Sequence, residues 1–137
     1  MTLSSERFPI TRIGFDNGLP LSVISFKALP FTVRRCYWLE IGFNQTRGSH
    51  AHKTLNQLLF CVFGEINLKL HDGESWNQLT ITPQSPGLLI SGVVWREINS
   101  VAPKSILFVL GDQDFDESDY IRSFDAFLSY TEKNKYL

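Results

Sequence analysis

The chain has 137 residues, of which 43% are hydrophobic and 20% are charged, and its formal net charge is −1. This length fits a single domain, 1–137, with a core of its own, and the composition excludes a disordered protein. The balanced charge gives no general attraction to nucleic acid or anionic membranes, so an anionic ligand would need a few local cations.

The N-terminal segment Phe8–Phe15 is the first with apolar residues. A small domain has little room to bury it. We expect this segment to cover a sheet edge of a second copy, which predicts a homodimer.

From Leu19 onward the sequence consists mainly of short apolar runs separated by turn residues. Nine runs are expected to form strands: Leu19–Phe26, Arg34–Ile41, His50–His52, Asn56–Phe63, Ile66–Leu70, Gln78–Ile81, Gly87–Ile90, Val93–Ile98 and Ser105–Leu110. Asp72-Gly73 between two runs is a strong hairpin signal, and we expect the neighbouring His71 to be exposed. Regularly spaced short strands without intervening helices predict an all-β antiparallel sandwich or barrel.

One helix is expected, at the end of the chain. From Asp116 onward, Ile121, Phe124, Phe127 and Leu128 recur at helical spacing, with polar residues between them. Acidic residues at its start and lysines at its end suit the helix dipole. We expect this helix to cover one side of the sheet structure and to bind no ligand.

The sequence also predicts the compartment. No run approaches the ~20 apolar residues of a membrane helix, and the polar start of the chain is unlike a secretory signal. Cys36 and Cys61 both lie in apolar segments, as small buried side chains do in a reducing compartment. We therefore expect a cytoplasmic protein with neither a membrane nor a nucleic acid as partner.

The segment from Arg47 to Lys53, Arg-Gly-Ser-His-Ala-His-Lys, is the richest in chemistry. Alternate residues of a strand share a face, so His50 and His52 point the same way. They are two of only three histidines in the chain, which favours a site over two unrelated polar residues. Imidazoles titrate near neutral pH, so the pair suits a reaction that moves a proton from one carbon to its neighbour.

A His-x-His pair is also typical of metal-binding cupins, but the other expected ligands are replaced. Gln57 stands at the position of the cupin carboxylate, and Arg96 lies in the stretch that would supply a later histidine. Arginine has no acceptor atom, and one amide with two imidazoles is a weak set for first-row metals. We expect no metal and no cofactor; an iron-dependent dioxygenase-type cupin stays an alternative.

Several of these motifs together resemble the dTDP-4-keto-6-deoxyglucose 3,4-ketoisomerases, small cupins of bacterial sugar-nucleotide pathways. The resemblance rests on Arg35-Cys36-Tyr37, the segment from Arg47 to Lys53, Gln57, and the segment from Asp116 to Arg122, and it extends from about Leu19 to Leu128. It implies a cupin-type jelly-roll homodimer that needs no metal and acts on a dTDP-linked 4-keto-6-deoxyhexose. Similar enzymes begin pathways to the deoxyamino sugars of surface glycans such as lipopolysaccharide O antigen.

The resemblance also implies roles for individual residues. His50 would carry a proton from carbon 3 to carbon 4 through an enediol, assisted by His52. Tyr37 would lie in the pocket and act on the same intermediate. The expected substrate-binding residues are Arg35, Arg47, Gln57, Trp95 and Arg96, with Arg47 able to clamp a diphosphate in a bidentate manner.

Arg96 is a departure from the family, whose most comparable members carry histidine there. Adjacent strand residues face opposite ways, so either Arg96 lines the pocket as an extra cation or Trp95 points inward in its place. Two other functions stay open: a sugar-nucleotide 3,5-epimerase, and a cupin that binds a nucleotide sugar without catalysis.

Overall fold

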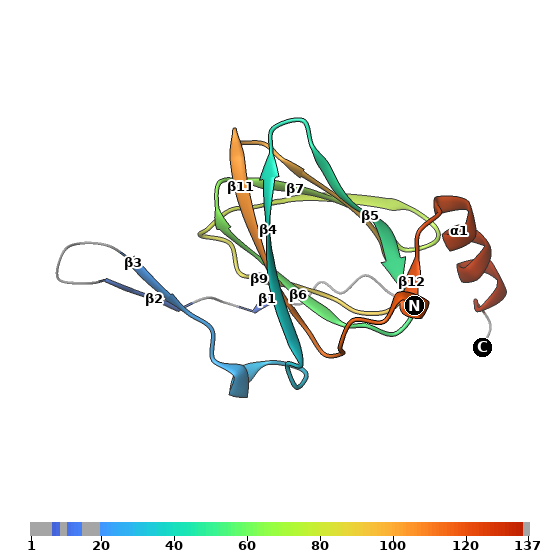
Figure 1. Cartoon of the computed structure of the whole chain (residues 1–137), viewed down its shortest axis with the longest axis horizontal. Helices are drawn as coiled ribbons and strands as arrows, with labels where there is room; N and C mark the ends of the chain where they lie inside the picture. The colour runs from blue at the N-terminus through green and yellow to red at the C-terminus, as the bar shows by residue number, and fades with distance from the viewer. Residues whose placement is uncertain (1–6, 9–10, 15–19, 136–137) are drawn as a thin grey trace.

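Short apolar strands make up most of the chain, and their buried faces meet between two five-stranded sheets. The computed structural model describes residues 7–8, 11–14 and 20–135 (Figure 1). The first sheet has the order β1 (Arg7–Phe8), β9 (Gly87–Ile90), β6 (Gln57–Phe63), β11 (Lys104–Gly111) and β4 (Arg35–Gly42). The second has the order β12 (Tyr120–Ile121), β5 (Thr46–His52), β10 (Trp95–Ser100), β7 (Ile66–His71) and β8 (Trp76–Ile81). The sheets form a sandwich and do not close into a barrel, which confirms the expected all-β architecture.

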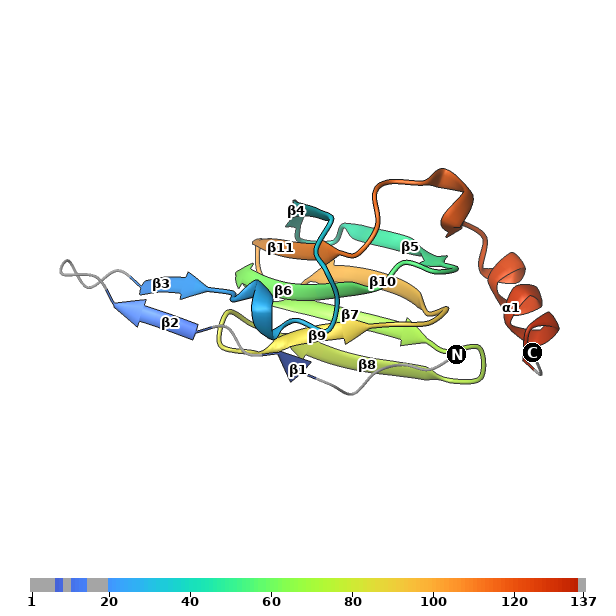
Figure 2. The same cartoon turned by 90° about the horizontal axis from the view of Figure 1, so that it is seen from below.

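Two smaller parts stand at opposite ends of the sandwich. The ribbon of β2 (Thr11–Gly14) and β3 (Pro20–Val23) extends away at one end, and α1 (Phe124–Lys133) covers the other (Figures 1 and 2). No helix in the described part of the chain is both long enough and apolar enough to cross a membrane.

The core lies between the two sheets. Leu68 and Leu70 of β7, Ile98 of β10, and Leu107 and Val109 of β11 are each at most 4% exposed. Burying an aliphatic side chain of this size contributes about 1.5–3 kcal/mol, so these residues hold the sheets together.

The predicted strands from Arg34 onward correspond to β4–β11, with shifted bounds. The run expected at His50–His52 is the end of a longer strand, because residues 46–48 pair with β10. The run expected at Leu19–Phe26 is shorter: β3 pairs only with β2, and a 3-10 turn follows at Phe26–Ala28. Leu19 and parts of Phe8–Phe15 lie outside the described residues.

The helix predicted from Asp116 onward begins only at Phe124, where the Ser123 side chain caps it by accepting a hydrogen bond from the Ala126 backbone N–H. Before it come a 3-10 turn at Glu117–Asp119 and strand β12, which pairs with the end of β5. The expected helix start at Asp116 is therefore wrong, because the backbone at Tyr120–Ile121 pairs with a distant strand and not within a helix.

His71 is buried, at 7% exposure, so the expectation that it would be exposed is wrong. Its ring lies with its centroid 4.9 Å from that of Trp76 and 5.3 Å from that of Phe124. The reason is α1, which covers this end of the β7–β8 hairpin.

Candidate active site

A cavity of about 460 Å³ opens between the two sheets, where β4 and β5 face each other. The segment 112–122, which follows β11, closes one side of this cavity, and we call it the closing segment. The lining includes four of the expected residues and three that were not expected: Arg35, Tyr37, Arg47 and His50, with Phe115, Tyr120 and Arg122.

A bulge in β5 sets the position of His50. Arg96 of β10 lies opposite His50, but the next residue of β10 lies opposite Gly48, so Ser49 is an extra residue in β5. Gly48 has a φ of 84°, and a Cβ there would lie 3.0 Å from the carbonyl oxygen of Arg96. Only glycine accepts both conditions without strain.

The Gly48 carbonyl oxygen lies 3.0 Å from Nδ1 of His50. A carbonyl oxygen can only accept, so Nδ1 of His50 carries the hydrogen and Nε2 holds the lone pair. The bulge therefore supplies the acceptor that fixes one tautomer of His50.

His52 does not line the cavity but lies directly behind it, 1% exposed. Its ring is perpendicular to that of His50, with 4.8 Å between centroids, and it lies 4.3 Å from the ring of Tyr120. Nδ1 of His52 lies 3.0 Å from a carboxylate oxygen of Asp119. The strand alternation therefore brings the two imidazoles together, one at the cavity wall and one behind it.

A chain of hydrogen bonds leads from the interior to Tyr37. Arg96, 2% exposed, donates from one terminal nitrogen to Oε1 of Gln57 and from the other to the carbonyl oxygen of Val94 at 3.0 Å. Since Oε1 of Gln57 accepts, its Nε2 donates to the hydroxyl oxygen of Tyr37, at 3.2 Å. The Tyr37 hydroxyl thus accepts from Gln57 and keeps its own proton for a group in the cavity.

Burial and the charge of Arg96 set the protonation states. Burial, together with Arg96, lowers the pKa of His50 from 6.5 to about 4. Burial and the same charge lower the pKa of His52 too, although its contact with Asp119 acts in the opposite direction. Burial raises the pKa of Tyr37, and it lowers that of Arg96 to about 10. At neutral pH the site therefore holds two neutral imidazoles, a neutral phenol and a guanidinium cation.

Arg96 points inward and Trp95 outward, but Arg96 is 2% exposed and lies behind the cavity, so neither of the two alternatives holds as expected. The indole of Trp95 packs in the cluster of α1, 5.4 Å from the ring of Phe124, and its Nε1 donates to Glu97 at 3.0 Å. The expectation that Trp95 binds substrate is therefore corrected: α1 covers the outer face of β10 and draws the large aromatic side chain there.

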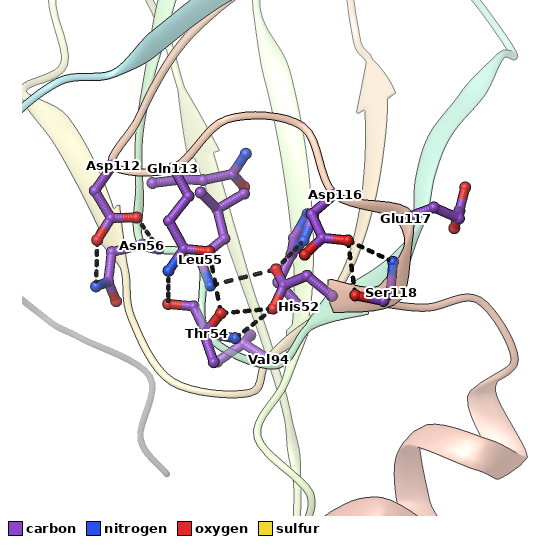
Figure 3. A network of polar contacts seen from close by, with 12 residues as sticks. His52, Thr54, Leu55, Asn56, Val94, Asp112, Gln113, Asp116, Glu117 and Ser118 are labelled. Atoms are coloured by element: carbon purple, nitrogen blue, oxygen red, sulfur yellow. Dashed lines mark hydrogen bonds and ion pairs between the residues drawn. The ribbon is translucent and has the colours of Figure 1, made fainter.

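Phe115, Tyr120 and Arg122 were missed as site residues, and so was Asp119. Their segment was noted as a motif but interpreted as the start of a helix. Arg122 stacks on Tyr120, with its guanidinium carbon 4.1 Å from the ring centroid, and it donates two hydrogen bonds to Glu117. Figure 3 shows the polar contacts that hold Asp112 and Gln113 to Asn56 and Thr54, in the turn between β5 and β6.

Among the described residues, His, Cys, Asp and Glu side chains form no group of three that could hold a metal ion. The two imidazoles of the site are accompanied by the neutral amide of Gln57 and the cation of Arg96. An amide is a weak ligand for first-row metals, and a guanidinium has no acceptor atom for one.

Three comparisons with known proteins agree with one another. The family FdtA: WxcM-like, C-terminal, matches residues 7–132. The TDP-4-oxo-6-deoxy-alpha-D-glucose-3,4-oxoisomerase of Aneurinibacillus thermoaerophilus is 34% identical over 119 residues, 86% of each chain. The structure of QdtA, a sugar 3,4-ketoisomerase from Thermoanaerobacterium thermosaccharolyticum in complex with TDP, is 30% identical, with a TM-score of 0.85 over 96% of both chains. A QdtA variant with histidine replaced by asparagine, in complex with TDP-4-keto-6-deoxyglucose, is 29% identical, with the same TM-score and coverage.

Proposed function

The chain belongs to the FdtA, WxcM-like family, and on this premise we propose that it is a dTDP-sugar 3,4-ketoisomerase. Its substrate would be dTDP-4-keto-6-deoxyglucose, whose keto group it moves from carbon 4 to carbon 3. The observation that carries the proposal is the neutral imidazole of His50 in the cavity wall, with its Nε2 lone pair free and the Tyr37 hydroxyl in the same cavity.

The reaction needs one proton to leave carbon 3 and one to arrive at carbon 4. In the first half, Nε2 of His50 takes the proton from carbon 3, and the electron pair moves onto the oxygen of carbon 4, to which Tyr37 donates. In the second half, the hydroxyl on carbon 3 gives its proton to the oxygen of Tyr37, and the His50 imidazolium gives carbon 4 a proton that has exchanged with solvent, leaving the ketone at carbon 3. A positioned acid–base group of this kind contributes about 10²–10⁴-fold to the rate.

The buried cation favours the intermediate. Negative charge develops on the sugar oxygens as the proton leaves carbon 3, and Arg96 lies close enough to lower the pKa values of both histidines. A fixed positive charge in a dry site stabilises such an oxyanion far more than it would in water.

The mouth of the cavity suits the nucleotide. Arg35, Arg47 and Arg122 supply guanidinium groups there, and arginine binds diphosphate oxygens in a bidentate manner. Phe115 is 61% exposed, with its ring 5.8 Å from the guanidinium carbon of Arg35, and it offers an aromatic face to the base. We assign these residues to the dTDP part of the substrate.

We also propose that the protein is a homodimer. The outer side of the first sheet exposes large apolar residues, among them Trp38 at 66% and Phe63 at 55%. Exposed aromatic groups of this size mark association surfaces, and an isolated two-stranded ribbon such as β2–β3 is marginal by itself. Light scattering on the purified protein should give twice the chain mass, and a value near one chain mass would contradict this.

The cytoplasm is the proposed compartment. Cys61 is buried as expected, whereas Cys36 is exposed, so that part of the expectation is wrong; both are free thiols, which fits a reducing environment. Detection of the native protein with the cytosolic fraction of its cell would test this assignment.

The activity is tested by incubating the protein with dTDP-4-keto-6-deoxyglucose in heavy water and following proton NMR. We expect the 3-keto isomer, labelled at carbon 4. Deuterium at carbons 3 and 5 instead would identify a 3,5-epimerase. His50→Asn should lose turnover by orders of magnitude and keep affinity for the substrate. Binding without turnover in the unaltered protein would identify a binding protein.

A further inference from the structure

The carboxylate of Asp119 is buried behind the cavity, next to His52. It is 8% exposed, and its Oδ1 accepts from the backbone N–H and the hydroxyl of Thr54 at 2.7 and 2.8 Å. Its Oδ2 lies 3.3 Å from the backbone nitrogen of Leu55 and 3.0 Å from Nδ1 of His52. Burial opposes its charge, but these hydrogen bonds keep the pKa of Asp119 below its ordinary value. The group is therefore an ionised acceptor held on both oxygens.

An ionised carboxylate can only accept, so Nδ1 of His52 must carry the hydrogen. The Nε2 atom of His52 is then an unprotonated acceptor. It is buried and has no hydrogen-bond partner among the described residues. A buried polar atom without a partner is costly, and such atoms occur where function requires them.

We propose that Asp119 is a positioning residue, which holds His52 in the tautomer that leaves Nε2 unprotonated beside His50. This role rests on the proposed function, because Nε2 of His52 can then accept the proton that His50 has taken from carbon 3 and return it to His50 before carbon 4 is protonated. It acts through His52, since Asp119 does not line the cavity. The same carboxylate also ties the segment 112–122 to the turn after β5.

Replacing Asp119 by asparagine gives a sharp prediction, because the side chain has only one way to fit. The amide oxygen should stay at the Oδ1 position, where two short hydrogen bonds from Thr54 meet it, so the NH2 group gives up only the longer contact with the backbone N–H of Leu55 and faces Nδ1 of His52. Nδ1 would then have to accept, and the hydrogen of the ring would move to Nε2. The variant keeps the shape of the site and reverses the tautomer.

The experiment uses 15N NMR of the three imidazole rings in the full chain. His71 is an internal reference of the opposite kind: its Nδ1 accepts from the backbone N–H of Gly73 at 3.0 Å, so its hydrogen is on Nε2. In the unaltered protein we expect His50 and His52 as Nδ1–H tautomers and His71 as Nε2–H. In Asp119→Asn, we expect the His52 ring to show the Nε2–H tautomer, as the His71 ring does.

Turnover is measured on the same variants. We expect Asp119→Asn to lower kcat by about 10²-fold with KM unchanged, as loss of a correctly poised acid–base group does. The matched control is Asp112→Asn, at the other end of the closing segment. The carboxylate of Asp112 accepts two hydrogen bonds of 2.9 Å from Asn56 and contacts no histidine (Figure 3). This control should leave kcat and all three tautomers unchanged.

Three results would overturn the proposal. The first is an Nε2–H tautomer of His52 in the unaltered protein, and the second is normal kcat in Asp119→Asn. The third is an equal loss of kcat in Asp119→Asn and Asp112→Asn, because that result would show a structural role only. If Asp119→Asn does not fold, the tautomer of His52 in the unaltered protein decides alone. If the protein has no isomerase activity at all, the proposed function fails, and the NMR result still decides the tautomer.

Discussion

Gln57 accepts a hydrogen bond from Arg96 and lies fully inside the sandwich with it, each 2% exposed. Among the described residues no carboxylate lies within ion-pair distance of Arg96. The neutral amide therefore leaves the positive charge unbalanced and at the same time directs the proton of Tyr37 toward the cavity.

Gln57→Glu should reverse both effects. A carboxylate would neutralise Arg96 and accept the Tyr37 proton, so we expect kcat to fall by about 10²-fold, as Tyr37→Phe should through loss of one oxyanion donor. The double variant should be no slower than the slower single variant, because both changes remove the same donor. Steady-state kinetics on the three variants check this, and additive losses would show that Gln57 does not act through Tyr37.

The pH dependence follows from the depressed pKa of His50. The base is neutral above a pKa of about 4, so kcat/KM should be level from neutral pH to about pH 5 and fall below pH 4. In Arg96→Gln, burial still lowers this pKa, but the smaller contribution from the Arg96 charge is gone, so the acid limb should move part of the way toward 6.5. The measurement is kcat/KM against pH for both proteins, and an unmoved limb would exclude the Arg96 charge as a contributor.

The stability of the fold, like kcat/KM, should decrease as the pH falls. The unfolded chain takes up a proton on His50 near pH 6.5, whereas the folded chain does so only near 4. The folded state therefore binds fewer protons in this range, so the free energy of unfolding should decrease as pH falls from 6.5 to about 4. Denaturant melts across this range check the sign; constant stability would contradict it.

Gly48→Ala should cost both stability and activity. A φ of 84° with a Cβ 3.0 Å from a backbone oxygen destabilises the fold by about 1–2 kcal/mol or more and displaces the carbonyl that holds His50. Gly73→Ala is the control, because Gly73 has a φ of 103° but lies in the β7–β8 turn. Thermal melts should show losses for both, and kcat should fall only for Gly48→Ala. Equal kcat values in Gly48→Ala and Gly73→Ala would show that the β5 bulge has no role in catalysis.

Removal of metal ions should leave turnover intact. The imidazoles of His50 and His52 are accompanied by an amide and a guanidinium, a poor ligand set beside a fixed positive charge. We expect unchanged kcat after dialysis against a chelator, with elemental analysis of the dialysed protein as the check. Activity lost on dialysis and restored by one metal per chain would contradict this expectation.

Alternation along a strand is a local property, so the sequence alone predicted that His50 and His52 share a face, whereas Arg35 and Tyr37 were assigned to the site on the family resemblance. The sequence left the orientation of Arg96 open, since alternation shows that neighbours point apart but not which one is buried. That choice depends on α1, which packs on β10 from a distant part of the chain.

The closing segment could not be predicted for a different reason. Phe124, Phe127 and Leu128 do form the expected helical face, and the same periodicity extends back to Ile121 by coincidence. Hydrogen bonds between Asp119 and Thr54, 65 residues apart in sequence, hold this part of the chain against β5 instead. Local propensity carries no signal for such a contact.

The two-residue strand β12 has one further consequence. It is the outermost strand of its sheet, next to β5, which carries both histidines. Without β12, the backbone of His52 would be a bare sheet margin, and bare margins recruit strands of other molecules. Substitutions that loosen residues 112–122 should therefore cause aggregation as well as inactivity. The two residues of β12 thus prevent β5 from pairing with strands of other molecules.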